Sequence, residues 1–177
     1  SSAFMRLSCL TIAGAESGNI KVGDSVAVFA QGPIGLCATL GARLKGASLI
    51  IGIDSIPERL EVARRFGANV TLNINDGDTI PEIKRLTGGR GVDVAIEAVG
   101  IPATFEFCQE IVAAGGHIAN IGVHGKSVSL HLERLWAHNI TLTTRLVDTV
   151  TTPMLLKNVS AGKLKPGQLI THEFRLD

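Results

Sequence analysis

A unit of strand, glycine turn, helix and strand between Asp24 and Asp54 constrains the fold of this chain more than any other stretch. An apolar run from Val26 to Ala30 predicts a buried strand, and a helical pattern follows from Ile34 to Lys45. A second apolar run, Leu49 to Ile53, then leads to Asp54. Two strands joined through a helix lie parallel in one sheet, with helices covering its faces. This unit alone therefore predicts an α/β fold.

The turn between the first strand and the helix follows the phosphate-binding pattern G-x-G-x-x-G, with Ala30 in the place of the first glycine. Gly32 lacks a Cβ, so a pyrophosphate can approach its backbone, and Gly35 lets the helix pack tightly on the strand. Pro33 suits a first helical turn because its missing N–H would have no partner there. The positive end of the helix dipole then faces the phosphates.

Asp54 ends the second strand about 20 residues beyond the turn, where a carboxylate can accept the ribose hydroxyls of an adenosine. The alternative is that Asp54, or the neighbouring Ser55, caps the helix that starts near Pro57. Glycine turns of this kind also occur in flavin proteins and methyltransferases. The complete unit, rather than its glycines, favours a dinucleotide.

Strand and helix patterns keep alternating along the rest of the chain. We expect one Rossmann-type domain over residues 1–177, a doubly wound parallel sheet with helices on both faces, after a helical lead-in of about 14–20 residues. The sixth strand of such a sheet lies at an outer edge. Further strands are predicted at Val70–Leu72, Val92–Ile96, His117–Ile121, Ile140–Thr144 and Ile170–Phe174, and helices at Phe4–Ile12 (before a turn at Gly14–Glu16), Pro57–Phe66, Thr79–Leu86, Pro102–Val112 and Pro153–Ala161, with an amphipathic segment at Leu130–Ala137.

Composition narrows the function classes. The formal charge is +1 and the chain has no basic run, which argues against nucleic acid. No apolar segment approaches a membrane span and the N-terminus carries no signal pattern, so we expect a cytoplasmic protein. Cys9, Cys37 and Cys108 are scattered, as expected of reduced thiols rather than a zinc site.

Four stretches together resemble the coenzyme domain of bacterial zinc-dependent alcohol dehydrogenases of the medium-chain family. They are AVFAQGPIGLCATLGARLKGA, GIDSIPERLEVARRFGA, GGRGVDVAIEAVG and TTRLVDTVTTPMLLKNVSAGKLKP. The resemblance implies hydride transfer between a short or secondary alcohol and NAD. It places Gly32, Pro33 and Ile34 at the pyrophosphate, Asp54 and Arg59 at the adenosine, and Val99, Gly122, Val123 and Leu146 at the nicotinamide. NAD is expected over NADP because Asp54 would repel a 2′-phosphate.

Zinc is expected only in a separate domain of the parent enzyme, because this chain shows no clustered ligands. The resemblance therefore implies the coenzyme-binding half of a longer dehydrogenase, and an isolated chain that is inactive. Two alternatives stay open. One is the coenzyme domain of a polyol or threonine dehydrogenase, and the other is a free-standing nucleotide-binding or methyl-transfer module.

Four histidines recur every seven residues, at His117, His124, His131 and His138. Intervening glycines preclude one continuous helix, so we interpret the period as coincidence. His124 is expected to be a solvated loop residue, although it could touch a ligand. For Glu97, a structural hydrogen-bonding role is preferred to a catalytic one.

The stretch Asn139 to Arg145 is rich in β-branched residues and lacks proline and glycine. At an outer edge of the sheet it can pair with its own copy about a twofold axis, so we expect a homodimer. The resemblance implies the same assembly. The alternative is a monomer in which the Leu155 to Lys163 segment covers this edge.

Overall fold

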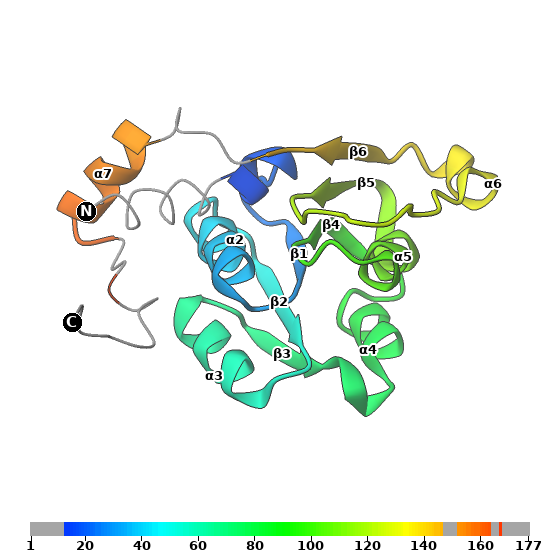
Figure 1. The fold of residues 1–177 in the computed structure, drawn as a ribbon, viewed down its shortest axis with the longest axis horizontal. Coiled ribbons are helices and arrows are strands. Elements are labelled where there is room, and N and C mark those ends of the chain that lie inside the picture. The colour runs from blue at the N-terminus through cyan, green and yellow to red at the C-terminus, as the bar shows by residue number, and fades with distance from the viewer. Residues whose placement is uncertain (1–12, 147–151, 164–166, 168–177) are drawn as a thin grey trace.

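The computed structural model describes residues 13–146, 152–163 and 167. They form a six-stranded sheet in which every paired strand is parallel, in the order β3-β2-β1-β4-β5-β6 (Figure 1). This order confirms the doubly wound fold predicted from the sequence. The strands are β1 (Ser25–Phe29), β2 (Leu49–Asp54), β3 (Val70–Asn73), β4 (Val92–Glu97), β5 (Val112–Asn120) and β6 (Thr141–Thr144).

Helices cover both faces of the sheet, and proline or glycine marks several of their ends. Proline occupies the first helical turn of α2, α3 and α5, where the lost N–H costs nothing. Gly67 ends α3 in a left-handed conformation with φ of 117°. The helices are α2 (Pro33–Leu44), α3 (Pro57–Phe66), α4 (Thr79–Leu86), α5 (Pro102–Ile111), α6 (Leu132–Leu135) and α7 (Thr152–Ser160), with short 3-10 turns η1 (Ile74–Asp76) and η2 (Trp136–His138).

Alternate residues of each strand point into two separate hydrophobic cores, one on each face of the sheet. Val26 and Val28 of β1 pack under α2 and α3, whereas Ala27 and Phe29 pack under α4 and α5. Cys108 belongs to the second core, where burial and secondarily the charge of Glu97 raise the pKa of its thiol well above the ordinary value. It therefore stays protonated at neutral pH, as expected of a structural cysteine. No helix in the described part of the chain combines the length and hydropathy that a bilayer crossing requires.

Two local predictions were wrong. Residues 13–17 are helical, although Gly14 was expected to begin a turn. A Cβ on Gly14 would lie 3.0 Å from Ile121, so packing against the sheet outweighs the low helix propensity of glycine. Val112 begins β5 instead of ending α5, and β5 runs through the glycines that were expected to precede it. A register shift opposite Val92 and Val94 accommodates them.

The remaining predicted elements are observed with ends shifted by at most a residue or two, apart from those that the structure does not cover. The segment predicted at Leu130–Ala137 forms α6 and η2. The helix at Phe4–Ile12, the strand at Ile170–Phe174 and Cys9 lie outside the described residues.

Ala30, directly after β1, has a left-handed backbone with φ of 68°. A side chain with a Cβ is disfavoured there by about 1–2 kcal/mol. This is the position at which the phosphate-binding pattern asks for glycine. Ala30 therefore keeps the backbone path of the turn but strains it.

Replacing Ala30 with glycine should stabilise the fold. We expect A30G to raise the free energy of unfolding by about 0.5–1 kcal/mol, since the relief of strain exceeds the entropy that glycine adds to the unfolded chain. Urea denaturation followed by circular dichroism measures this. A27G, in the middle of β1, is the control and should destabilise the protein. A lower midpoint for A30G would show that Ala30 is not strained.

Candidate nucleotide-binding cleft

The carboxyl ends of the parallel strands form one rim of the sheet. The chain leaves β1 for α2 on one face and leaves β4 for α5 on the other, and these two strands are neighbours. Between such a pair the two following loops diverge and leave a crevice, which is where ligands of doubly wound sheets bind. The glycine turn lies at this crevice.

Gly32 and Gly35, the two glycines of the turn, have different structural roles. A Cβ on Gly32 would meet only the Arg59 guanidinium, 3.9 Å away, so the backbone there is open to a ligand. A Cβ on Gly35 would collide with the carbonyl oxygen of Ala30. Gly35 is thus required for the contact between α2 and β1, whereas Gly32 is not required by the fold. Pro33 is exposed in the first turn of α2, and Ile34 packs partly into the core.

Asp54 organises the loops on both sides of the crevice. It is 6% exposed, and its Oδ2 accepts a hydrogen bond from the Gln31 backbone N–H at 2.6 Å. Its Oδ1 accepts one from the Ile56 N–H at 2.9 Å, and the Arg59 Nη1 lies 3.7 Å from Oδ2. Asp54 does not cap α3, whose N-cap is Ile56 without a side-chain hydrogen bond. The carboxylate therefore joins the end of β2 to the glycine turn and keeps lone pairs for further donors at the rim.

A cavity of about 250 Å³ opens at this end of the rim. Its lining includes Val99 and also Phe29 and Phe107, whose rings are stacked with centroids 5.9 Å apart. An apolar lining beside a carboxylate suits a heteroaromatic base joined to a ribose. The lining residues are Phe29, Ala30, Ile53, Asp54, Ser55, Arg59, Ile74, Val99, Ile101, Ala103, Thr104 and Phe107.

A second cavity of about 230 Å³ lies at the ends of β5 and β6. Val123 and Leu146 are 75% and 82% exposed there, so this part of the rim carries exposed apolar side chains. Of the residues expected at a dinucleotide, Asp54, Arg59 and Val99 line the first hollow and Gly122, Val123 and Leu146 the second, whereas residues 32–35 line neither. The second hollow is lined by Asn120, Ile121, Gly122, Val123, Thr144, Arg145 and Leu146.

Glu97 and His124 lie beside the rim and close to each other, and the sequence analysis did not predict this pairing. Glu97 is fully buried and accepts three hydrogen bonds, which confirms the structural role expected for it. The His124 side chain is only 16% exposed, with Nε2 3.3 Å from the Glu97 Oε2, so the expectation of a solvated loop residue was wrong. One sequence signal could have linked them, because Glu97 ends β4 and His124 follows the end of the neighbouring strand β5.

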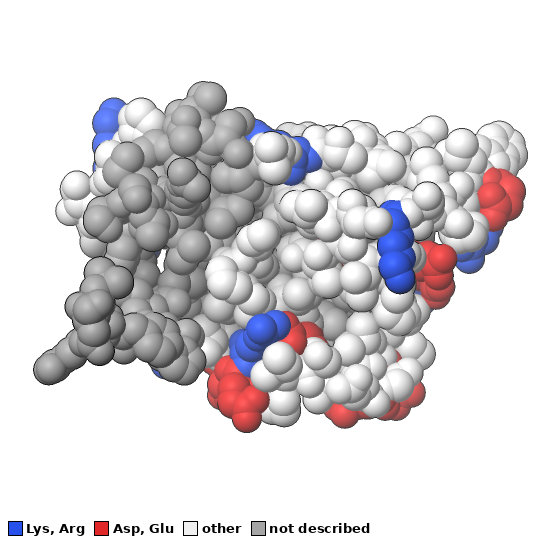
Figure 2. Space-filling model, viewed as in Figure 1, with Lys and Arg blue, Asp and Glu red and all other residues white. Residues whose placement is uncertain are grey.

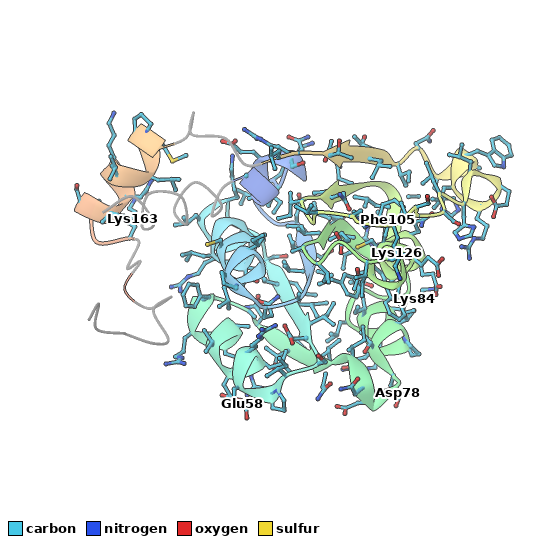
Figure 3. The ribbon with its side chains drawn as sticks, viewed as in Figure 1. Glu58, Asp78, Lys84, Phe105, Lys126 and Lys163 are labelled. Carbon is cyan, nitrogen blue, oxygen red and sulfur yellow. The ribbon has the colours of Figure 1, made fainter. Side chains whose placement is uncertain are left out.

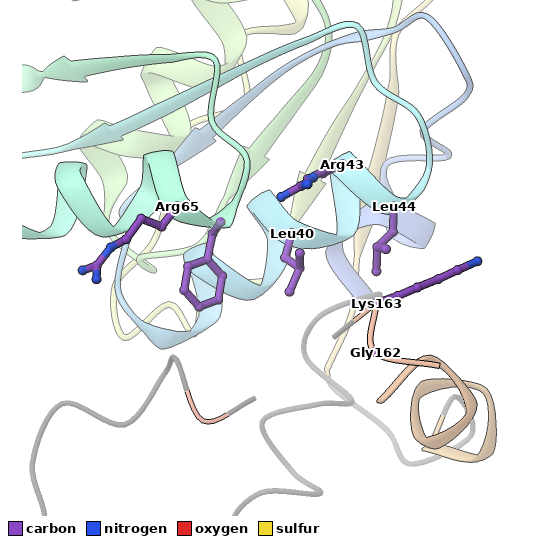
Figure 4. Close-up of a pocket in the computed structure, with 7 residues that line it drawn as sticks. Leu40, Arg43, Leu44, Arg65, Gly162 and Lys163 are labelled. Atoms are coloured by element: carbon purple, nitrogen blue, oxygen red, sulfur yellow. The ribbon is translucent and has the colours of Figure 1, made fainter. Parts of the chain in front are cut away.

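A larger cavity, of about 530 Å³, lies away from this rim (Figure 4). It is lined by the last turns of α2 and α3 and by residues following α7, including Arg43, Arg65 and Lys163. Helices of a parallel sheet return to its amino edge, so this cavity lies opposite the glycine turn.

The four histidines of the seven-residue period are dispersed. His117 is on β5, His124 is in the following loop, His131 precedes α6 and His138 is in η2. Within residues 13–146, 152–163 and 167, no three His, Cys, Asp or Glu side chains are grouped as a metal site would require. The described residues thus do not fit a zinc ion.

Comparison with known proteins agrees with this geometry. Residues 33–160 match the zinc-binding dehydrogenase family. An alcohol dehydrogenase from Cupriavidus necator is 45% identical over 171 residues, which are 93% of this chain and 46% of that protein. An NADP-dependent isopropanol dehydrogenase from Thermoanaerobacter brockii is 38% identical, over 92% of this chain and 48% of that protein.

The structure of zinc-dependent alcohol dehydrogenase 2 from Streptococcus pneumonia superposes with a TM-score of 0.90 at 48% identity, over 95% of this chain and 49% of that one. The chain spans about half the length of the relatives it matches. From the family match and these identities, the chain belongs to the zinc-binding dehydrogenase family.

Proposed function

We propose that this chain binds NAD(H) along the rim and forms the coenzyme domain of an alcohol dehydrogenase. The open backbone above Gly32, at the N-terminus of α2 and at the crossover between β1 and β4, carries the proposal. A pyrophosphate there accepts hydrogen bonds from unpaired N–H groups of α2. The adenosine then lies towards Asp54 and Arg59, and the nicotinamide towards Val99, Gly122, Val123 and Leu146. Membership of a dehydrogenase family disfavours a methyltransferase.

The bound coenzyme would supply a hydride acceptor, while the chain holds and orients it. Short or secondary alcohols are the proposed substrates, supported by relatives named for alcohol and isopropanol. A polyol is the second candidate, because a Bacillus subtilis relative that is 31% identical is named sorbitol dehydrogenase. We propose that the zinc ligands belong to another part of the parent enzyme, and that the isolated chain is therefore inactive.

Replacing Gly32 with alanine tests the coenzyme site without disturbing the fold. The new Cβ has free space in the protein but occupies the approach of the pyrophosphate. We expect G32A to weaken NADH binding by about tenfold or more. The unfolding midpoint should stay unchanged, because surface substitutions of this kind change the free energy of unfolding by no more than about 0.5 kcal/mol. Fluorescence titration with NADH measures the affinity. G167A, at another glycine with open surroundings, is the control. Equal NADH affinity in G32A and wild type would remove the pyrophosphate from this turn.

We propose that NAD is preferred to NADP, although several relatives are named for NADP. The Asp54 side chain is only 4% exposed, so solvent screens its negative charge poorly. The Arg59 side chain lies 3.7 Å away and is 47% exposed, so its positive charge is screened more strongly. A 2′-phosphate beside Asp54 would be repelled by about 1–3 kcal/mol, which the more solvated arginine offsets only in part.

Exchanging Asp54 for serine should narrow the difference between the two coenzymes. We expect wild type to bind NADH about tenfold more tightly than NADPH, and D54S to bring the two affinities within about threefold. The variant also loses the acceptor of two backbone N–H groups, which lowers the free energy of unfolding by about 1–3 kcal/mol. The calorimetric titrations are therefore carried out at low temperature, after circular dichroism has shown that the variant is folded. Equal binding of NADPH and NADH by wild type would contradict the proposal.

We also propose a homodimer formed through β6. Of the strands that the structure describes, β6 lies at one end of the sheet order, and Leu142 is 37% exposed. Figure 2 shows few charged side chains on the surface over β5 and β6. Arg145 forms an ion pair with Glu16 at 3.0 Å, so its charge is partly compensated. The monomer alternative requires α7 to cover the free edge of β6. Leu155 of α7 is instead buried near Leu40 and Leu44 of α2.

A proline at Leu142 should separate the dimer and spare the sheet. The Arg145 N–H bonds Asn120 of β5, and successive N–H groups of a strand point to opposite sides, so the Leu142 N–H points to the free edge. We expect light scattering to give twice 18.6 kDa for wild type and a lower mass for L142P. L142T, which keeps the N–H, should remain dimeric. A wild-type mass near 18.6 kDa would contradict the proposal.

A further inference from the structure

Glu97 holds the loop that follows β4. Its Oε1 accepts hydrogen bonds from the backbone N–H groups of Val99 at 3.0 Å and Gly100 at 2.9 Å, and from the Thr104 hydroxyl at 2.6 Å. Three donors on one oxygen of a fully buried carboxylate fix the conformation of the whole turn. Gly100 has φ of 93° within this turn, a conformation that other residues rarely adopt.

The other oxygen of Glu97 faces the loop that follows β5. Its Oε2 lies 3.3 Å from the His124 Nε2 and has no hydrogen-bond partner with good geometry. A Cβ on Gly122 would collide with this oxygen, so the β5 loop passes directly over the carboxylate. One buried side chain therefore touches both loops beside the second hollow of the rim.

His124 is itself held in place. Its Nε2 lies 2.7 Å from the Asn120 Oδ1, and the Asn120 Nδ2 donates to the Gly122 carbonyl. Since Asn120 must then accept through Oδ1, the His124 Nε2 carries the proton, and the same nitrogen lies 3.3 Å from the Glu97 Oε2. Phe105 of α5 (Figure 3) meets the imidazole edge-on, with ring centroids 6.1 Å apart. The ring is thus fixed by contacts on several sides.

We propose that Glu97 and His124 are positioning residues that hold the two loops of the nicotinamide end together. The inference rests on the proposed function, and deepens it by assigning the geometry of the reacting end to a buried pair that touches no coenzyme. Val99, on one loop, and Gly122 and Val123, on the other, are the residues proposed to meet the nicotinamide. Loosening the pair lets the loops separate. The adenosine cavity takes Val99 from the β4 loop and Thr104 from α5 but no residue from the β5 loop, so loosening His124 should leave the adenosine end unaffected.

This division between the two ends separates positioning from a general structural role. ADP-ribose contains the adenosine and pyrophosphate of NADH but lacks the nicotinamide. A variant that only weakens the fold should impair both ligands alike. A variant that frees the β5 loop should impair NADH binding alone.

The test uses titration calorimetry of the chain with NADH and with ADP-ribose. E97Q keeps an acceptor for the β4 loop but turns an amide N–H₂ towards the His124 N–H, donor against donor. H124F keeps an aromatic ring and loses the donor, whereas H124Q keeps a donor near the position of Nε2. We expect H124F to weaken NADH binding by about tenfold and ADP-ribose binding by less than about twofold, with H124Q close to wild type. E97Q should weaken the binding of both ligands, because the β4 loop that Glu97 holds also lines the adenosine cavity.

A spectroscopic readout and a matched control complete the experiment. The fluorescence maximum of bound NADH reports the surroundings of its nicotinamide, and should shift towards that of free NADH in E97Q and H124F. E133Q makes the same substitution in an exposed pair, in which Glu133 lies 3.1 Å from the His131 Nδ1, and should leave both affinities and the spectrum unchanged.

Each outcome is decisive. In H124F, parallel losses of NADH and ADP-ribose affinity, or no loss of either, would overturn the positioning role. If E97Q does not fold, the comparison of H124F with H124Q carries the test, and equal NADH affinities in those two would overturn it. A wild-type chain that binds neither ligand would instead overturn the proposed function.

Discussion

The contact between α2 and β1 at Gly35 is the constraint on which the rest of the structure depends. No side chain fits between Gly35 and the Ala30 carbonyl, so the helix begins directly against the end of the strand. That close approach aims the N-terminus of α2 at the crevice between β1 and β4. It also forces the turn residue Ala30 into a left-handed conformation. The path of the backbone at this turn, rather than any side chain, therefore creates the candidate site.

Two buried carboxylates then fix the loops around the crevice. Asp54 ends β2 and accepts the N–H groups of Gln31 and Ile56, while Glu97 ends β4 and accepts those of Val99 and Gly100. Charged acceptors form stronger hydrogen bonds than neutral ones, and burial protects them from competing water. Each carboxylate organises one side of the rim. This arrangement explains how short loops, which lack cores of their own, can present a defined surface to a ligand.

Much of the fold could be predicted from the sequence because its signals are local. The apolar runs of β1 and β2, the proline that starts α2 and the glycine that ends α3 each encode their own element. The boundary of α5 and β5 could not be found in this way, since it depends on a register shift opposite Val92. The helix over residues 13–17 was missed for a related reason. Its glycine is tolerated only because the sheet packs closely on it.

The candidate site shows the same division. The glycine turn and Asp54 follow a pattern within one contiguous unit, and so could be identified. The pairing of Glu97 with His124 joins two loops through the order of strands in the sheet, which no spacing in the sequence displays. Burial decides the role of His124, and burial is a property of the folded chain.

Hydrogen–deuterium exchange with and without NADH tests the central claim most directly, because it locates the coenzyme on the chain. The account predicts slower exchange at the backbone amides of residues 31–32, 34–36, 55–56, 98–101 and 121–124, which lie along the rim. Protection confined to the opposite cavity, at Arg43, Arg65 and Lys163, with no change at the rim, would contradict it.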